Sequence, residues 1–175
     1  ANAFTLLFKK YFSQLHSYGL KMSNNQNLTE DCLQNFFIQL YEEREKPTTI
    51  KNLKAYLFVS FKRRLIKQLQ KNQKNIPISE AQLFHSNFTF SAEEISIHQE
   101  IQFLCTSTLA QLVNQLSPRQ KEVIYLKYYS EMNTTDIAEV MDMNYQSVLN
   151  VLQKALCKLR LNSENQHIKN ILKKS

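Results

Sequence analysis

Apolar residues recur at every third or fourth position along most of this chain, which is the spacing of amphipathic helices. Three such runs occupy the N-terminal part, over residues 4–22, 27–44 and 50–74. The first helix is expected to end near Gly19, and the second to be capped by Thr29, which two acids follow. Pro47 separates the second helix from the third. The buried stripe of the second helix is predicted to be Leu33, Phe36, Phe37, Leu40 and Tyr41.

Four further helical runs occupy the C-terminal part, over residues 91–116, 117–129, 134–141 and 145–160. Ser91 and Glu94 have capping-box spacing, and Ser117 followed by Pro118 is a strong start signal. Asn144 is expected to cap the last helix. Because the last two helices are joined by only three or four residues, the pattern indicates a helix-turn-helix, whose second helix enters a DNA major groove.

The helical pattern is lost between Asn72 and Ala92, in a polar, proline-containing stretch that is typical of a linker. We therefore predict two small helical domains, residues 1–72 and 93–162, with a linker at 73–92 and a C-terminal tail at 163–175. The linker holds too many apolar residues for a purely flexible tether, so we expect parts of it to dock on a partner or on the domains. These residues are Ile76, Ile78, Leu83, Phe84, Phe88 and Phe90.

Composition favours an all-α fold, because one glycine and three prolines leave little of the turn chemistry that β-hairpins require. No run approaches the roughly 20 apolar residues of a membrane-spanning helix, and no charged-then-apolar leader opens the sequence. These features predict a soluble, cytoplasmic protein.

The net charge of +7 is unevenly distributed. Residues 1–72 hold twelve Lys and Arg against five Asp and Glu, a balance of +7, whereas residues 93–160 hold six against eight, a balance of −2. Residues 51–74 contain eight basic residues and no acid. This stretch is suited to a polyanion such as a nucleic acid.

The sequence gives no support for an enzyme or for a bound cofactor. Cys32, Cys105 and Cys157 are far apart and have no Cys or His at metal-ligand spacing, so buried, reduced thiols are expected. The four histidines are also scattered, and no Ser/His/Asp grouping, carboxylate pair or glycine-rich phosphate loop is present. We predict neither a metal nor a catalytic residue.

Two segments resemble the extracytoplasmic-function (ECF) sigma factors of the sigma-70 superfamily. "LTEDCLQNFFIQLYEEREKPTTIKNLKAYLFVSFKRRLIKQLQK" is similar to the family's second conserved region, and "LSPRQKEVIYLKYYSEMNTTDIAEVMDMNYQSVLNVLQKALCKLR" to its fourth. The resemblance implies a subunit that binds RNA polymerase core, melts the minus-ten promoter element and reads the minus-thirty-five element. "NYQSV" and "KAYLFVSFKRRL" further resemble the sigma factors of gut Bacteroidetes. An anti-sigma factor is a further possible partner.

The resemblance places polymerase binding on the second helix, at Asp31, Gln34 and Asn35, where the family presents an acidic and polar face to basic clamp helices. Asn35 stands where the family usually has Glu, so part of that attraction is missing. Phe37 and Tyr41 match core aromatics of the family.

Contact with the minus-ten element is assigned to the third helix and the residues just before it. Its cations neutralise phosphates, and an exposed ring can stack on an unpaired base. We favour DNA contact for the cations, and core packing over stacking for Tyr56 and Phe61. Arg63 and Lys67 replace the Asn and Asp usual in the family, so its base preference does not transfer. The candidates are Lys51, Asn52, Tyr56, Lys62, Arg63, Arg64, Lys67 and Lys71.

Contact with the minus-thirty-five element is assigned to the last helix, because Gln and Asn side chains can pair with adenine. Many relatives carry Lys or Arg at Leu149 and often at Val151, which we interpret as packing positions, so weak binding by the isolated domain is expected. Asp142 occupies a turn position where glycine is usual, and Asp tolerates the left-handed conformation. The candidates are Asn144, Tyr145, Gln146, Ser147, Leu149, Asn150, Gln153 and Lys154.

Two other functions remain open at this point. One is a free-standing helix-turn-helix regulator of the response-regulator type, although residues 1–90 show neither the strands nor the Asp cluster of its receiver domain. The other is a helical protein-interaction module that no longer binds DNA. Leu149, Val151 and the acidic balance of the second domain favour it, whereas the basic run at 51–74 argues against it.

Overall fold

The computed structural model describes residues 3–44, 50–72, 88–91 and 103–172. All regular secondary structure in these ranges is helical, as predicted. The chain divides into two compact units, one formed mainly by residues before Phe88 and the other mainly by residues after it. Most of the predicted linker, and Glu94 of the predicted capping box, lie outside the described residues.

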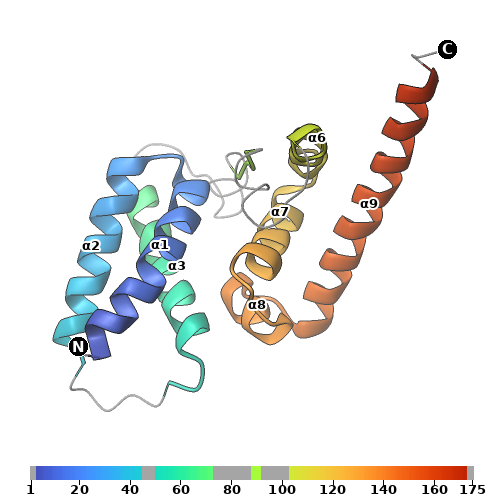
Figure 1. The fold of residues 1–175 in the computed structure, drawn as a ribbon. Helices are drawn as coiled ribbons and strands as arrows, with labels where there is room; N and C mark the ends of the chain where they lie inside the picture. The colour runs from blue at the N-terminus through green and yellow to red at the C-terminus, as the bar shows by residue number, and fades with distance from the viewer. Residues whose placement is uncertain (1–2, 45–49, 73–87, 92–102, 173–175) are drawn as a thin grey trace. The chain divides into compact units, whose positions relative to one another are not determined.

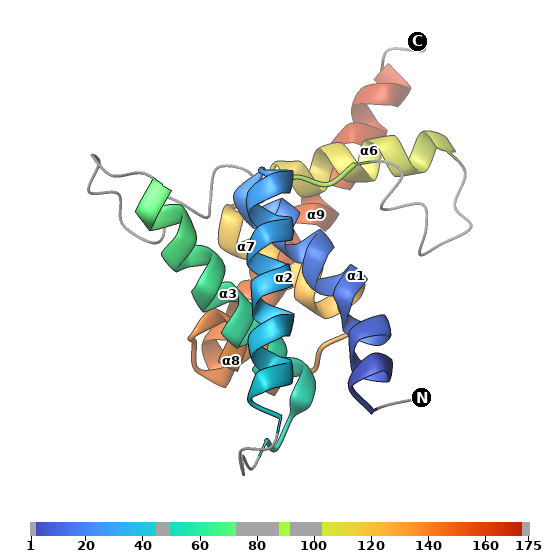
Figure 2. The same cartoon turned by 90° about the vertical axis from the view of Figure 1, so that its left-hand side faces the viewer.

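The first unit is a bundle of three helices that pack against one another in pairs (Figures 1 and 2). They are α1 (Ala3–Ser23), α2 (Gln26–Glu42) and α3 (Leu53–Asn72). Large side chains from all three are fully buried between them, among them Leu15, Tyr18, Leu33, Phe58, Phe61 and Leu65. This core fixes the helix faces on which the candidate site residues stand.

Gly19 does not end the first helix, contrary to the sequence prediction. Helix α1 continues to Ser23, and Gly19 is buried within it. A Cβ atom at Gly19 would lie 2.7 Å from Cγ2 of Thr29 and 2.9 Å from the ring of Phe61. The glycine is therefore needed for close packing of α1 against α2 and α3.

Thr29 does not cap the second helix, which also corrects the prediction. The N-cap of α2 is Asn25, whose side chain accepts a hydrogen bond from the Leu28 N–H at 3.0 Å. Thr29 is fully buried one turn later, where its hydroxyl lies 2.7 Å from that of Ser23. Both residue types are good caps, and the tertiary contact with the end of α1 assigns Thr29 to the interior.

The described chain from Phe103 onward forms α6 (Phe103–Asn114), α7 (Pro118–Ile124), the π-helical η1 (Tyr125–Tyr129), α8 (Thr134–Met141) and α9 (Tyr145–Leu172). All of this stretch except Ala138–Asp142 belongs to the second unit. Ser117 and Gln120 form a complete capping box at the start of α7, with Pro118 in the first turn, so this predicted start is confirmed. Both α6 and α7 pack on α9. Helix α9 runs without a break through the predicted tail, as far as Leu172 (Figure 1).

Phe88 and Phe90, at the end of the predicted linker, are docked on the second unit. Both rings are buried, and they contact Tyr125 at centroid distances of 5.5 and 6.2 Å. The Asn114 side chain holds the backbone of Phe90 at both polar groups, accepting from its N–H and donating to its C=O, each at 2.9 Å. The expectation that parts of the linker dock on the domains is confirmed for these two residues.

Replacing Asn114 with alanine is expected to release this segment, because two backbone groups of Phe90 lose their partners at a cost of about 1–3 kcal/mol. Exchange of the Phe90 amide hydrogen, measured by NMR, should accelerate at least about tenfold. Asn162→Ala removes a surface amide–amide hydrogen bond to Gln115 and serves as the control. Equal Phe90 exchange in the two variants would contradict the role given to Asn114.

Candidate functional site

The predicted minus-ten residues of α3 do not share one face. Arg63, Lys67 and Lys71 are exposed, whereas Lys62 and Arg64 are half-buried. Arg64 donates a hydrogen bond to Oε1 of Gln39 on α2. The helix therefore directs Arg64 toward α2, while Arg63 next to it faces outward.

The two aromatics of α3 have different environments. Phe61 is fully buried, which confirms the core interpretation, whereas Tyr56 is only half-buried, so part of this residue stays accessible. Lys51, before the helix, is exposed. Asn52 caps α3, since its Oδ1 accepts from the Ala55 N–H at 3.1 Å. This local role accounts for an amide at this position without any DNA contact.

The predicted polymerase-binding residues Asp31, Gln34 and Asn35 are all exposed on neighbouring turns of α2. Gln34 and Asn35 border different hollows of the first unit. Gln34 lines a groove between α1 and α2, and Asn35 lines another between α2 and α3. Asp31 lies one turn before both. Sequence spacing alone does not show this separation.

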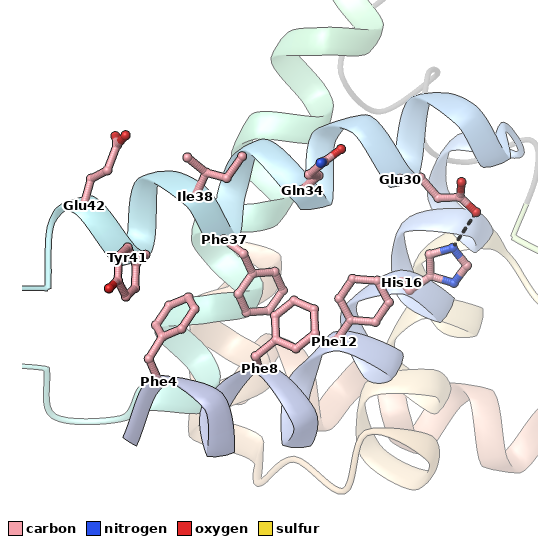
Figure 3. Close-up of a pocket in the computed structure, with 10 residues that line it drawn as sticks. All are labelled: Phe4, Phe8, Phe12, His16, Glu30, Gln34, Phe37, Ile38, Tyr41 and Glu42. Carbon is pink, nitrogen blue, oxygen red and sulfur yellow. Dashed lines mark ion pairs between the residues drawn. The ribbon is translucent and has the colours of Figure 1, made fainter. Parts of the chain in front are cut away.

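The groove between α1 and α2, called here the aromatic groove, has a volume of about 860 Å³ (Figure 3). Phe8 packs edge-on against Phe37 at a centroid distance of 4.8 Å, and Phe4 packs against Tyr41 at 5.0 Å. Its lining consists of Phe4, Phe8, Phe12, His16, Glu30, Gln34, Phe37, Ile38, Tyr41 and Glu42. Aromatic rings thus form most of the apolar surface that the groove presents.

Sequence reasoning missed this groove and misplaced one of its residues. Phe37 is buried, as predicted, but Tyr41 is 42% exposed and is not a core residue. Ile38, outside the predicted stripe of α2, is 51% exposed. The sequence offered one signal for this groove, an apolar residue off the buried stripe. That signal is weak by itself, because single exposed apolar residues are common and only their clustering marks a binding surface.

Acidic side chains lie at both ends of the aromatic groove (Figure 3). Glu30 approaches His16 at 3.5 Å at one end, and Glu42 lies at the other. An apolar floor with acids at its ends suits an amphipathic helix that carries basic residues beside its apolar face.

The helix-turn-helix predicted near the C-terminus is present in α8 and α9. Asp142, in the turn, has φ of 51°, the left-handed conformation for which a glycine is usual. Asn144 caps α9 as predicted, accepting from the Ser147 N–H at 2.7 Å. Asp142 thus supplies the left-handed turn residue before α9, and Asn144 defines the N-terminal end of that helix.

The first three turns of α9 present an exposed polar face. Tyr145 is 53% exposed, and Gln146 donates to Oδ1 of Asn150 at 3.3 Å across one turn. Gln153 and Lys154 are also exposed. Ser147, Leu149 and Val151 are half-buried, which agrees with the packing interpretation of Leu149 and Val151. Cys157, expected to be a buried thiol, is instead exposed, and Leu156 next to it is 41% exposed.

The part of the chain that the structure describes contains no group of three or more His, Cys, Asp or Glu side chains arranged to hold a metal ion. None of the described helices is both long and apolar enough to cross a membrane.

Comparison with known proteins identifies both units. The family pattern "Sigma-70 region 2" matches residues 7–75, and "Sigma-70, region 4" matches residues 107–159. The chain is 23% identical to the ECF RNA polymerase sigma factor SigM of Bacillus subtilis (strain 168), an alignment that covers 88% of this chain and 91% of SigM.

A solved structure has the same fold: the sigma factor RpoE of Bartonella quintana, in complex with the anti-sigma factor NepR. It superposes with a TM-score of 0.60 at 21% identity, over 91% of this chain and 96% of RpoE. The two family matches together span most of the chain, and each lies largely within one of its two helical units. The chain therefore belongs to the sigma-70 family, as an RNA polymerase sigma factor of the ECF type, and is an initiation factor rather than an enzyme.

Proposed function

We propose that this sigma factor docks polymerase core on α2 and the aromatic groove, and contacts promoter DNA with α3 and α9. The acids at the ends of the groove, together with Asp31, complement the basic clamp helices that the family resemblance implies. Asn35 contributes no charge to this surface, so the apolar floor around Ile38 and Tyr41 carries a larger share of the binding energy.

The minus-ten element is contacted by the outward face of α3. Arg63 and Lys67 are exposed on neighbouring turns and supply phosphate attraction, while the accessible part of Tyr56 can stack on an unpaired base. Lys51 extends the basic surface before the helix. The residues that set base preference in the family are replaced here, so the preferred minus-ten sequence differs from that of the usual relatives.

The minus-thirty-five element is read by Gln146, Asn150 and Gln153 on the exposed face of α9. Amide side chains pair with adenine in the major groove, and each good pair contributes about 1–3 kcal/mol of discrimination. Leu149 is half-buried at a position where many relatives carry a cation. Because that phosphate attraction is missing, the second unit alone binds DNA weakly. Attachment to polymerase raises its effective concentration at the promoter and makes this contact sufficient.

One observation carries the proposal: exposed amides are gathered on the first turns of α9, and exposed cations are gathered on α3. The amides that can contact base edges and the cations that can contact phosphates thus lie on helices of different units. These partners imply a cytoplasmic protein. An anti-sigma factor is a further proposed partner, since the solved relative RpoE is bound to one. The similarity to sigma factors of gut Bacteroidetes stays a prediction.

Run-off transcription with polymerase core tests the proposal. The full-length protein is expected to give transcripts only from promoters that contain its two elements, and only when core is present. The double variant Gln146→Ala/Asn150→Ala should lose about tenfold or more of its preference for the minus-thirty-five element. Gln111→Ala, an exposed amide on α6, is the matched control.

The rival functions predict other results. A free-standing regulator would bind duplex DNA specifically without core, whereas a module that has lost DNA binding would bind core and yield no transcript. Either result would refute the proposal.

A further inference from the structure

A second groove, called here the cationic groove, lies between α2 and α3 and has a volume of about 320 Å³. Its lining consists of Cys32, Asn35, Gln39, Arg64, Lys67, Gln68 and Lys71. Three of these side chains are cations, three are amides and none is a carboxylate. The cations are spaced at i, i+3 and i+7 on α3, so they form one stripe beside α2.

Arg64 is held in place before any ligand arrives. Its guanidinium donates to Oε1 of Gln39 and lies 5.7 Å from the ring centroid of Phe36. Gln39 is fixed in turn, because its Nε2 donates to Oε1 of Glu43 at 2.9 Å. Gln39 is thus a positioning residue, and a planar guanidinium held in this way loses little entropy when it binds an oxyanion.

No carboxylate is among the described residues that line the groove, so its positive charge has no counter-ion within that lining. The ion pair between His16 and Glu30 lies at the aromatic groove instead. The Cys32 thiol also stays neutral, because burial raises its pKa to about 11 although the charge of Arg64 acts in the opposite direction. At neutral pH the groove therefore presents cations and amide donors without a thiolate beside them.

We propose that the cationic groove binds phosphate groups. Arg64, Lys67 and Lys71 engage the phosphate oxygens, and the amide groups of Asn35 and Gln68 donate further hydrogen bonds. The phosphate comes either from the backbone of single-stranded DNA or from a free diphosphate. If the phosphate belongs to promoter DNA, this inference rests on the proposed function and adds α2 to the DNA-binding surface. It also assigns Asn35 to a phosphate site instead of the polymerase surface.

Two probes test this with the full-length protein: single-stranded oligodeoxythymidylate and inorganic pyrophosphate. In the variant Arg64→Gln/Lys71→Gln, oligonucleotide affinity is expected to fall about tenfold at low salt. The salt slope of that affinity should fall by about 1.4, or about 0.7 for each lost phosphate contact. For pyrophosphate, the reporter is the NMR shift of the Asn35 and Gln68 side-chain amides.

The control is Lys9→Gln, which removes one exposed charge from α1 at a position that lines neither groove. Because Arg64 also packs on Phe36, the single variant Lys71→Gln, at an exposed site, keeps the test valid if the double variant unfolds. It should lower oligonucleotide affinity about threefold, with a salt slope smaller by about 0.7.

Weakened oligonucleotide binding without a pyrophosphate response supports the DNA backbone as the source. A pyrophosphate response that the double variant abolishes, with unchanged oligonucleotide binding, supports a free diphosphate. If the groove variants match Lys9→Gln with both probes, the proposal is overturned. Neither probe requires polymerase. The outcome of this binding test therefore does not depend on whether promoter-dependent transcription is observed.

Discussion

Glutamate in place of Ile38 is expected to weaken binding of polymerase core about 100-fold. Ile38 is 51% exposed and lines the aromatic groove from α2, at a position along that helix between Glu30 and Glu42. The new carboxylate would be buried in an apolar contact without a partner and repelled by Glu30 and Glu42, at a cost of several kcal/mol. The dissociation constant of the sigma–core complex, measured by fluorescence anisotropy, checks this.

Leu6→Glu is the matched control, since Leu6 is a 59% exposed apolar residue of the same unit that does not line the groove. Its binding should remain within about twofold of the wild type. Circular dichroism should show that both variants stay folded, because each replaced side chain is largely in solvent. If Ile38→Glu binds core as tightly as Leu6→Glu does, the aromatic groove is not the docking surface.

The helix starts were predicted correctly where the signal is local. Ser117, Pro118 and Gln120 form a capping box among themselves, and Asn144 caps its own helix, so neighbouring residues suffice to define both starts. Thr29 shows the limit of this reasoning. It looks like a cap in sequence, but the end of α1 packs over it and leaves that role to Asn25.

The candidate site was predictable to the extent that it lies on one helix. The exposed amide face of α9 follows from the 3.6-residue period alone. The two grooves of the first unit do not, because each depends on how a pair of helices packs. Gln34 and Asn35 are adjacent in sequence, yet one borders aromatic rings of α1 and the other borders cations of α3. A single-helix pattern cannot assign them to different ligands.

Gly19→Val is expected to destabilise the first unit by about 3 kcal/mol, at the upper end of the usual cost of overpacking. The Cβ alone would approach Cγ2 of Thr29 to 2.7 Å and the Phe61 ring to 2.9 Å. Both neighbours are fully buried, so neither can move aside into solvent. The gain in helix propensity when a glycine is replaced, below about 1 kcal/mol, does not offset this strain.

Amide hydrogen exchange of the full-length chain measures the effect in each unit separately. In Gly19→Val, exchange of the Leu33 amide, in the core of the first unit, should accelerate on the order of 100-fold, while the Val123 amide in the second unit serves as internal reference. Ser13→Val, at an exposed position of α1, controls for introducing a β-branched residue into that helix and should change exchange less than about threefold. A wild-type exchange rate for Leu33 in Gly19→Val would mean that α1 can separate from α2 and α3 at little cost. Such loose packing would also widen the aromatic groove, because α1 forms one of its walls.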